Sequence, residues 1–245
     1  MKRNIIIEPD LDQLSRRGAD IFSRMARECV RLRGFFAVAL SGGSTPRTLH
    51  RMLCEAPYIS DIPWKDTHIF WADERCVGVG DPANNYGTAK AEFLDRAPAP
   101  ENQVHPMPVN LPPAQGAIDY EREVMEFFQV RMSPIPVFDL IFLGIGADGH
   151  TASLFPGQSA LKEDKRLVVP VSGGTPNVER LTVTLPLLNN ARQIVFLVSG
   201  RDKAATLKRI LEGPMADIPA QRVQPVEGTV TWILDQMAAS LIHPG

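Results

Sequence analysis

Four short, uninterrupted apolar segments constrain the fold of this chain more than any other feature. They are FFAVAL, HIFWA, FDLIFLGIG and IVFLVSG, at residues 35–40, 68–72, 138–146 and 194–200. An apolar run of this length, bounded by glycine or polar residues, is typical of a strand that is buried on both faces. Helical patterns lie between the second and third runs, at 114–130, and after the fourth, at 202–211. The alternation predicts an α/β fold with a mostly parallel, twisted sheet and helices on both faces.

A long amphipathic helix is predicted before the first run. Its apolar residues recur at helical spacing and are Leu14, Ile21, Phe22, Met25 and Cys29. Asp10 is placed to cap the start of this helix, and Gly34 to end it. The proline clusters at 98–113 and 134–136 are short and flanked by predicted elements, so we interpret them as loops. We therefore expect one domain over residues 1–245, and a division near residue 133 is the alternative.

Composition and net charge argue against several classes of binding partner. Lys plus Arg number 26 against 28 Asp plus Glu, a net charge of -2, which favours neither nucleic acid nor a membrane as a partner. Three consecutive isoleucines near the N-terminus are too few for a signal peptide, and no apolar run approaches the roughly 18 residues of a membrane span. The three cysteines form no CxxC pair, which argues against a disulfide framework and a zinc site. We expect a cytoplasmic protein that is a monomer or a small homo-oligomer.

The residues that follow each apolar run are the candidates for a ligand site, because ligands of open parallel sheets bind beyond the carboxyl ends of the strands. The first run is followed by SGGSTP at residues 41–46, with Thr45 as the predicted helix N-cap and Pro46 in the first turn. Glycines and a helix N-terminus favour a phosphate here, and a plain strand-to-helix turn is the alternative. The GxxxxGK[ST] spacing of a P-loop is absent.

Charged residues follow the other three runs. Asp73, Glu74 and Arg75 follow the second run, Asp148 and His150 the third, and Lys203 the fourth. A histidine two residues from an aspartate, on a glycine-containing loop, suits a general base with an orienting carboxylate. The alternatives are a solvated turn for the triplet, a structural histidine, and ordinary surface charge for the lysine.

The sequence GIGADG at residues 144–149 satisfies the GxGxxG fingerprint of dinucleotide-binding proteins. The acidic residue expected to end a second strand about 20 residues later is missing, because the segment 167–171 is followed by Ser-Gly-Gly. Asp148 inside the turn would also repel a pyrophosphate. We therefore expect no dinucleotide cofactor.

Taken together, these blocks resemble the family of 6-phosphogluconolactonases and glucosamine-6-phosphate deaminases. The resemblance covers nearly the whole chain, and its most specific stretch is GIGADGHTASLFPG at residues 144–157. The other matching blocks are FFAVALSGGSTP, HIFWADERCV, NNYGTAKAEFL, VERLTVTLPLLNNARQIVFLVSGRDKA, PAQRVQP and VTWILDQMAAS. The resemblance implies a Rossmann-like fold of the glucosamine-6-phosphate deaminase type.

The activity implied is that of a carboxylic ester hydrolase. It would hydrolyse 6-phospho-D-glucono-1,5-lactone to 6-phospho-D-gluconate, the second step of the oxidative pentose phosphate pathway, without a cofactor or a metal. The residues implied to bind the 6-phosphate are Ser41, Gly42, Gly43, Ser44, Thr45, Arg180 and Lys203. His150 would deprotonate the attacking water, and Asp148 and Asp73 would orient the water or the sugar hydroxyls. Arg75 would neutralise the oxyanion that forms on the lactone carbonyl.

A lactone is an activated ester, so attack by water needs no covalent nucleophile. No GxSxG elbow surrounds Ser41 or Ser153, and the histidines show neither HxxxH nor HxH spacing. Two other functions stay open, a deaminase and a non-catalytic sugar-phosphate sensor. The related sensors carry a helix-turn-helix module for which we expect no place here. Whether Lys65 or Arg222 reaches the site also stays open.

The segment after the histidine separates the two activities of the family. In the deaminases, the corresponding loop ends in Asn-Glu-Pro, and its glutamate completes an acid–base relay with the histidine. This chain has Leu154, Phe155 and Pro156 there. A phenylalanine cannot carry a proton, so the resemblance is closer to the lactonases.

Overall fold

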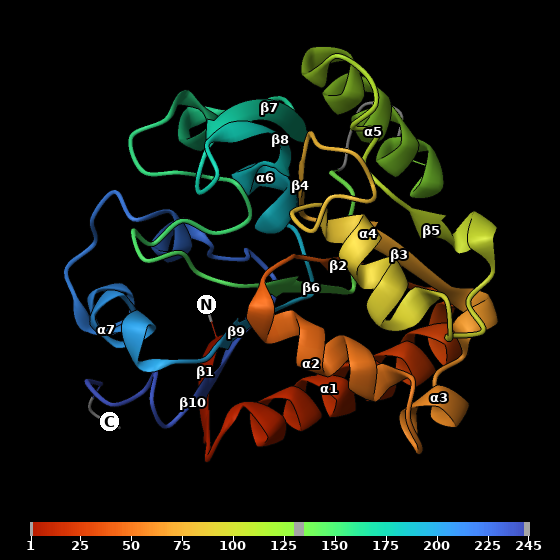
Figure 1. Ribbon diagram of the computed structural model, residues 1–245, viewed down its shortest axis with the longest axis horizontal. Coiled ribbons are helices and arrows are strands. Elements are labelled where there is room, and N and C mark those ends of the chain that lie inside the picture. The colour runs from red at the N-terminus through yellow and green to blue at the C-terminus, as the bar shows by residue number, and fades with distance from the viewer. Residues whose placement is uncertain (1, 130–134, 243–245) are drawn as a thin grey trace.

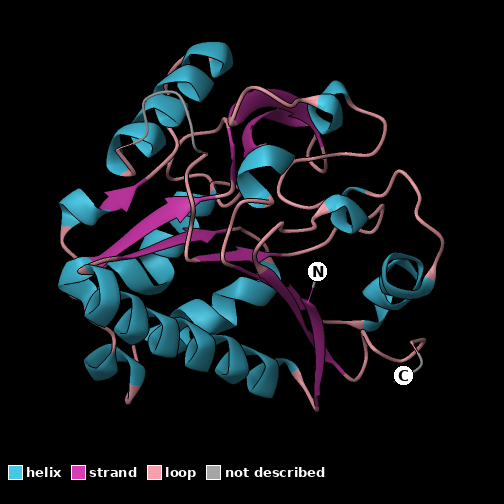
Figure 2. Ribbon diagram, turned by 180° about the vertical axis from the view of Figure 1, so that it is seen from behind, coloured by secondary structure: helices cyan, strands magenta, loops and turns pink. Residues whose placement is uncertain are grey.

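A central sheet of seven parallel strands organises the computed structural model, which describes residues 2–129 and 135–242 (Figure 1). The strand order is β1-β10-β9-β6-β2-β3-β5, and every neighbouring pair is parallel. The strands are β1 (Lys2–Glu8), β2 (Phe36–Leu40), β3 (Thr67–Trp71), β5 (Val104–His105), β6 (Leu140–Leu143), β9 (Gln193–Val198) and β10 (Thr229–Asp235). Helices flank the sheet (Figure 2), so the predicted α/β fold is confirmed.

The four predicted apolar runs form β2, β3, β6 and β9, which lie together inside the sheet. Every residue of β2 and β6 is buried, which explains why these runs are apolar without alternation. The third run was predicted to continue to Gly146, but β6 ends at Leu143 and the glycines form a loop. Only three consecutive isoleucines mark β1, which lies at the sheet edge and leaves Ile5 and Ile7 partly exposed.

The long N-terminal helix is confirmed as α1 (Leu11–Arg33). The side chain of Asp10 accepts a hydrogen bond from the backbone N–H of Gln13, and Gly34 adopts a left-handed conformation with φ of 84°. The other helices are α2 (Ser44–Leu53), α3 (Tyr58–Asp61), α4 (Asn85–Ala89), α5 (Pro113–Phe127), α6 (Leu185–Leu188) and α7 (Ala204–Glu212). The helix predicted at 114–130 ends at Phe127, and residue 130 lies outside the described residues. The one predicted at 202–211 begins at Ala204, after a 3₁₀ turn at Arg201–Lys203.

The prediction that Thr45 caps the second helix was wrong. Helix α2 begins at Ser44, its N-cap is Gly43, and Pro46 is its third residue. Gly43 has a φ of 113°, which glycine adopts without strain and which turns the chain into the helix earlier than expected. Because no side chain caps α2, its first backbone N–H groups stay available to a ligand.

A second, antiparallel sheet of three strands was not predicted. Its order is β4-β8-β7, with β4 at Asp73–Arg75, β8 at Val178–Val183 and β7 at Val168–Gly173. The chain passes from β3 of the large sheet into β4 through Ala72 alone. The small sheet therefore places Asp73 and Arg75 beside residues about a hundred positions later in the chain.

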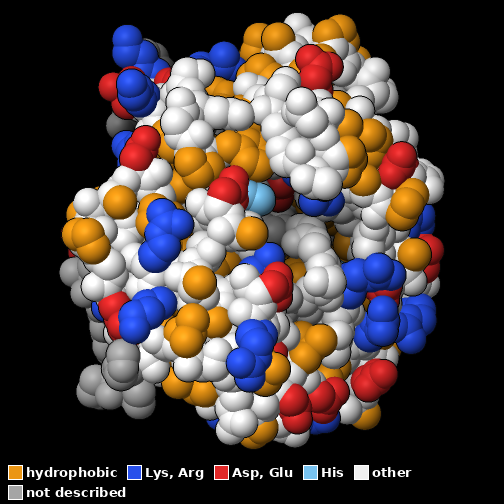
Figure 3. Space-filling view, turned by 60° about the vertical axis from the view of Figure 1, so that its left-hand side comes forward, with side chains coloured by type: hydrophobic (Ala, Val, Ile, Leu, Met, Phe, Trp, Pro, Cys, Tyr) orange, Lys and Arg blue, Asp and Glu red, His pale blue; other side chains and the backbone are white. Residues whose placement is uncertain are grey.

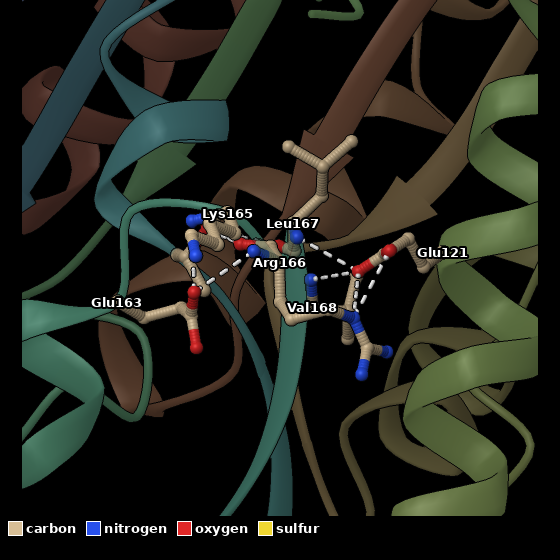
Figure 4. Close-up of polar contacts among 7 residues, drawn as sticks. Glu121, Glu163, Lys165, Arg166, Leu167 and Val168 are labelled. Atoms are coloured by element: carbon tan, nitrogen blue, oxygen red, sulfur yellow. Dashed lines mark hydrogen bonds and ion pairs between the residues drawn. The ribbon is translucent and has the colours of Figure 1, made fainter. Parts of the chain in front are cut away.

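Helix α5 packs against the small sheet and fixes where β7 begins (Figure 1). The carboxylate of Glu121 accepts hydrogen bonds from the backbone N–H groups of Leu167 and Val168 and from Nε of Arg166 (Figure 4). The carboxylate of Glu163 accepts hydrogen bonds from the backbone N–H groups of Lys165 and Arg166, in the turn that precedes β7. These contacts hold the β7–β8 hairpin over the carboxyl end of the large sheet.

The order of the strands reverses between β2 and β6. From β2 the chain builds outward through β3 to β5, and from β6 it builds in the opposite direction through β9 to β10. Connections on the two sides of such a point diverge and leave a crevice beyond the strand ends, where ligands of this fold class bind. Among the described residues, no helix is both long and apolar enough to cross a membrane.

Candidate active site

A cavity of about 660 Å³ lies at the carboxyl ends of β2, β3 and β6, where the strand order reverses. Figure 3 shows a molecular face with a hollow near its centre, where basic, acidic and histidine side chains lie close together. The cavity is lined by Ser41, Gly42 and Gly43 from the loop after β2. Its charged and titratable lining residues are Asp73, Arg75, Asp148, His150, Arg180 and Lys203.

A smaller pocket of about 150 Å³ adjoins this cavity and shares Gly42, Gly43 and Lys203 with it. Ser44 and Thr45, at the start of α2, line this pocket and not the larger cavity. The structure therefore brings all eleven predicted site residues to two adjoining hollows. Lys65 and Arg222, which the sequence left open, line neither of them.

The loop after β2 contains polar groups that have no hydrogen-bond partner among the described residues. The hydroxyl of Ser41 is buried and makes no hydrogen bond with any described residue. A Cβ atom on Gly42 would lie 1.8 Å from Oδ1 of Asn85, so only glycine fits between the loop and that side chain. With the uncapped N-terminus of α2, this loop suits an anion.

His150 is held by Asp148 at the edge of the larger cavity. Nδ1 of the His150 ring lies 2.6 Å from Oδ1 of Asp148, and the His150 backbone N–H donates to the same oxygen at 3.1 Å. Burial would raise the pKa of Asp148, but these hydrogen bonds and the nearby imidazole outweigh it, so that the pKa lies below its ordinary value. An imidazole that donates from Nδ1 keeps a lone pair on Nε2, the arrangement that a general base requires.

Gly146 is what lets the ring lie so close to the backbone. A Cβ atom on this glycine would lie 2.1 Å from Nδ1 of His150 and 2.7 Å from Oδ1 of Asp148. On the other side, the ring of Phe155 lies 4.7 Å from the imidazole, measured between centroids. The histidine is thus confined between a glycine and an aromatic wall.

Asp73 and Arg180 are joined through a buried serine. Ser153 Oγ donates to Oδ2 of Asp73 at 2.6 Å, and Nη1 of Arg180 donates to the same hydroxyl at 3.4 Å. The guanidinium also donates to the carbonyls of Gly173 and Pro176 and lies 5.5 Å from the Phe155 ring centroid. Burial, and then the charge of Arg75, lower the pKa of Arg180.

Arg75 and Arg180 are direct partners in the antiparallel ladder between β4 and β8. Two like charges opposite each other in a sheet repel, and an anion beside both of them offsets the repulsion. Nη1 of Arg75 donates to the Ala83 carbonyl at 2.8 Å and to Oδ1 of Asn85 at 2.7 Å. Both arginines line the cavity.

Several residues of the site escaped the sequence interpretation. Gly174 and Thr175, from the β7–β8 hairpin, line the cavity, and Ser153 was considered only as a nucleophile. The Ser-Gly-Gly after the segment 167–171 is the kind of strand-end signal that could have pointed to this hairpin. In the described part of the chain, no group of three or more His, Cys, Asp or Glu side chains is arranged to hold a metal ion.

Comparison with known proteins points to one family. Residues 9–232 match the family model described as glucosamine-6-phosphate isomerases/6-phosphogluconolactonase. The chain is similar to a 6-phosphogluconolactonase of Synechocystis sp., with 44% identity over 86% of this chain and 87% of the relative. It is also similar to the solved structure of a 6-phosphogluconolactonase from Thermotoga maritima, with a TM-score of 0.83 and 28% identity over 96% of this chain and 100% of that one. A monomeric glucosamine-6-phosphate deaminase shares the fold, with a TM-score of 0.81 and 21% identity over 99% of this chain and 100% of that one.

Proposed function

Because this chain belongs to the glucosamine-6-phosphate isomerase/6-phosphogluconolactonase family, we propose that it hydrolyses 6-phospho-D-glucono-1,5-lactone to 6-phospho-D-gluconate in the oxidative pentose phosphate pathway. The hydrogen-bonded pair of His150 and Asp148 carries this proposal, because it lies in the same cavity as the glycine loop and Lys203. A base and an anion site thus lie within reach of one sugar phosphate.

The phosphate is bound in the smaller pocket. There Gly42, Gly43, Ser44 and Thr45 surround it with backbone N–H groups and hydroxyls, and Lys203 adds a positive charge. Ser41 lines the larger cavity and adds its hydroxyl from there. Arg180 lines only the larger cavity, so it contacts the phosphate from that side. The lactone ring then extends into the larger cavity, towards His150.

Hydrolysis proceeds by direct attack of water. Nε2 of His150 takes a proton from a water molecule as its oxygen bonds to C1 of the lactone, and Asp148 stabilises the imidazolium that forms. The carbonyl oxygen becomes an oxyanion beside the guanidinium of Arg75. When the tetrahedral intermediate collapses, the bond from C1 to the ring oxygen breaks and the imidazolium returns its proton to that oxygen. Asp73 orients the sugar hydroxyls.

The residue beside the histidine favours this reaction over deamination. Opening the ring of an amino sugar needs a separate acid, and Phe155 stands where the deaminases of the family have a glutamate. Its ring packs against His150 and cannot exchange a proton with it. A lactone is already electrophilic at C1 and needs no such acid.

Proton release from fresh lactone tests the proposal. We expect the protein to accelerate acid release from the phosphorylated lactone far above the spontaneous rate, and to act much more slowly on the unphosphorylated lactone. Binding of the lactone or of 6-phosphogluconate without acceleration would favour a sensor instead.

A further inference from the structure

The guanidinium of Arg75 has little to hold it in place. Strand β4, which carries Arg75, is three residues long and leads into a loop. Among the described residues, Asn85 is the side chain that hydrogen-bonds this guanidinium, and the Ala83 carbonyl is its other partner. Nε of Arg75 is buried and has no described partner. An arginine side chain has many rotamers, so the direction of its guanidinium depends on such contacts.

Asn85 is itself fixed from two sides. Its Nδ2 donates to the Asp73 carbonyl at 2.8 Å, and its Oδ1 accepts from Arg75. Because an arginine only donates and a carbonyl only accepts, the amide can be oriented in one way only. Asn85 is 4% exposed, and it does not line the cavity. The residue therefore acts on a ligand only through its neighbours.

A buried carboxylate ties the backbone of Asn85 to that of Arg75. Oε1 of Glu74 accepts the N–H groups of both Arg75 and Asn85, each at 2.7 Å, and Oε2 accepts that of Tyr86 at 2.7 Å. Glu74 is 1% exposed. The start of α4 is thus clamped to β4, so that the Asn85 amide and the Arg75 guanidinium belong to one rigid unit.

The same side chain also supports the glycine loop. Oδ1 of Asn85 lies within 1.8 Å of the place where a Cβ atom of residue 42 would be, so the loop rests on the amide. Asn85 is therefore in contact with the loop that we propose binds phosphate and with the arginine that we propose stabilises the oxyanion.

We propose that Asn85 is a positioning residue that holds the Arg75 guanidinium at the place where the oxyanion forms. The inference rests on the proposed function of Arg75. A donor that is already aimed at the developing charge needs no reorganisation during the reaction, so its loss lowers the rate of the chemical step more than the affinity. The structure thus assigns Asn85 an effect on kcat that passes through Arg75.

The variant Asn85→Ala tests this, with Asn84→Ala as the matched control. Asn84 is the same residue type, is 1% exposed, and also makes two side-chain hydrogen bonds, to the N–H of Gly87 and the carbonyl of Val77. We expect Asn85→Ala to lower kcat about 10- to 100-fold with KM within threefold. Asn84→Ala should keep kcat within about threefold of the wild-type value, even if its melting temperature falls as much as that of Asn85→Ala. Should Asn85→Ala not fold, Asn85→Ser, which keeps a small polar group, replaces it.

A double-mutant cycle separates positioning from a general structural role. If Asn85 acts through Arg75, adding Asn85→Ala to Arg75→Ala lowers kcat no further than Arg75→Ala does alone. The same fold loss in both backgrounds, or no loss in the wild-type background, would overturn the inference.

Exchange of the Arg75 Nε proton with water, followed by NMR, gives a readout that needs no substrate. The Nε group is buried in the wild type, so its exchange should be slow, and Asn85→Ala should speed it at least tenfold while Asn84→Ala leaves it unchanged. Unchanged exchange in Asn85→Ala would contradict the positioning role. Faster exchange in a protein that hydrolyses no lactone would instead mean that the proposed function fails and the positioning of Arg75 stands.

Discussion

Oδ1 of Asp148 accepts two hydrogen bonds from His150, one from the backbone N–H and one from Nδ1 of the ring, only two residues away in the chain. The pair depends on the glycines of the same loop, since Gly149 has a φ of 87° and Gly146 leaves room for the ring. This short loop at the end of β6 supplies the proposed base already oriented towards the cavity.

Replacing the proposed base, His150, should lower kcat and leave the affinity for the phosphorylated ligand nearly unchanged. We expect His150→Gln to lower kcat by about 10²- to 10⁴-fold, because general-base catalysis contributes that much. The affinity for 6-phosphogluconate, measured by calorimetry, should change little, since the phosphate pocket does not include this residue. Turnover near that of the wild type would rule out His150 as the base.

The pH dependence of the same variant offers a separate check. A base must be neutral to accept a proton, so kcat/KM of the wild type should fall on the acid side of its pH profile. The residual activity of His150→Gln should lack this acid limb. An identical acid limb in both proteins would assign it to another group.

Room for the imidazole is tested by Gly146→Ala. The added Cβ would lie 2.1 Å from the ring, and the histidine must move to relieve the clash. We expect kcat to fall about 10²-fold, the loss that a 1 Å misplacement of a reacting group can cause. Gly78→Ala is the control, because no atom lies within 4 Å of a Cβ built there. Equal activity in the two variants would show that the ring position is not critical.

Lys203 and Arg180 should make the protein prefer the phosphorylated lactone over the unphosphorylated one. We expect Lys203→Ala and Arg180→Ala each to lower kcat/KM for the phosphorylated lactone, because charge-assisted hydrogen bonds are lost. The loss should correspond to about 1.5–3 kcal/mol of transition-state stabilisation. The loss should be much smaller for the unphosphorylated lactone. Arg201→Ala, at an exposed neighbouring position outside both hollows, should resemble the wild type. Equal losses on both lactones would show that Lys203 and Arg180 do not recognise the phosphate.

Stability towards acid should depend on His50, which packs against Phe93 with ring centroids 4.9 Å apart and does not line the cavity. Burial lowers the pKa of His50 from 6.5 to about 4. The unfolded chain therefore binds a proton at a pH where the folded chain does not, and stability is lost as the pH falls from 6.5 towards 4. Between pH 7.5 and pH 5 the loss should be about 2 kcal/mol.

Urea unfolding of the wild type and of His50→Leu at both pH values isolates this contribution, because other groups cancel in the difference. The variant should lose less stability than the wild type on acidification. Parallel pH dependences would show that His50 is not responsible.

What the sequence could and could not predict follows from the range of the interactions involved. The four predicted strands are almost wholly buried inside the sheet, so a local apolar run marks each of them, and the loops after them line the two adjoining hollows. Strand β4 is only DER, and it is a strand because it pairs with β8, more than a hundred residues later. No local pattern contains that pairing, nor the contact of Asn85 with Arg75 or that of Ser153 with Asp73. The start of α2 was misplaced because a glycine backbone, and not a hydroxyl, begins the helix.

One measurement tests most directly whether this site hydrolyses a lactone and does not deaminate an amino sugar. A single purified sample is given 6-phosphogluconolactone in one assay and glucosamine 6-phosphate in another, and proton release and ammonia release are followed under matched conditions. We expect rapid lactone hydrolysis and no detectable ammonia, because Phe155 beside His150 cannot supply the proton transfer that ring opening needs. Ammonia release at a rate comparable to lactone hydrolysis would contradict the account.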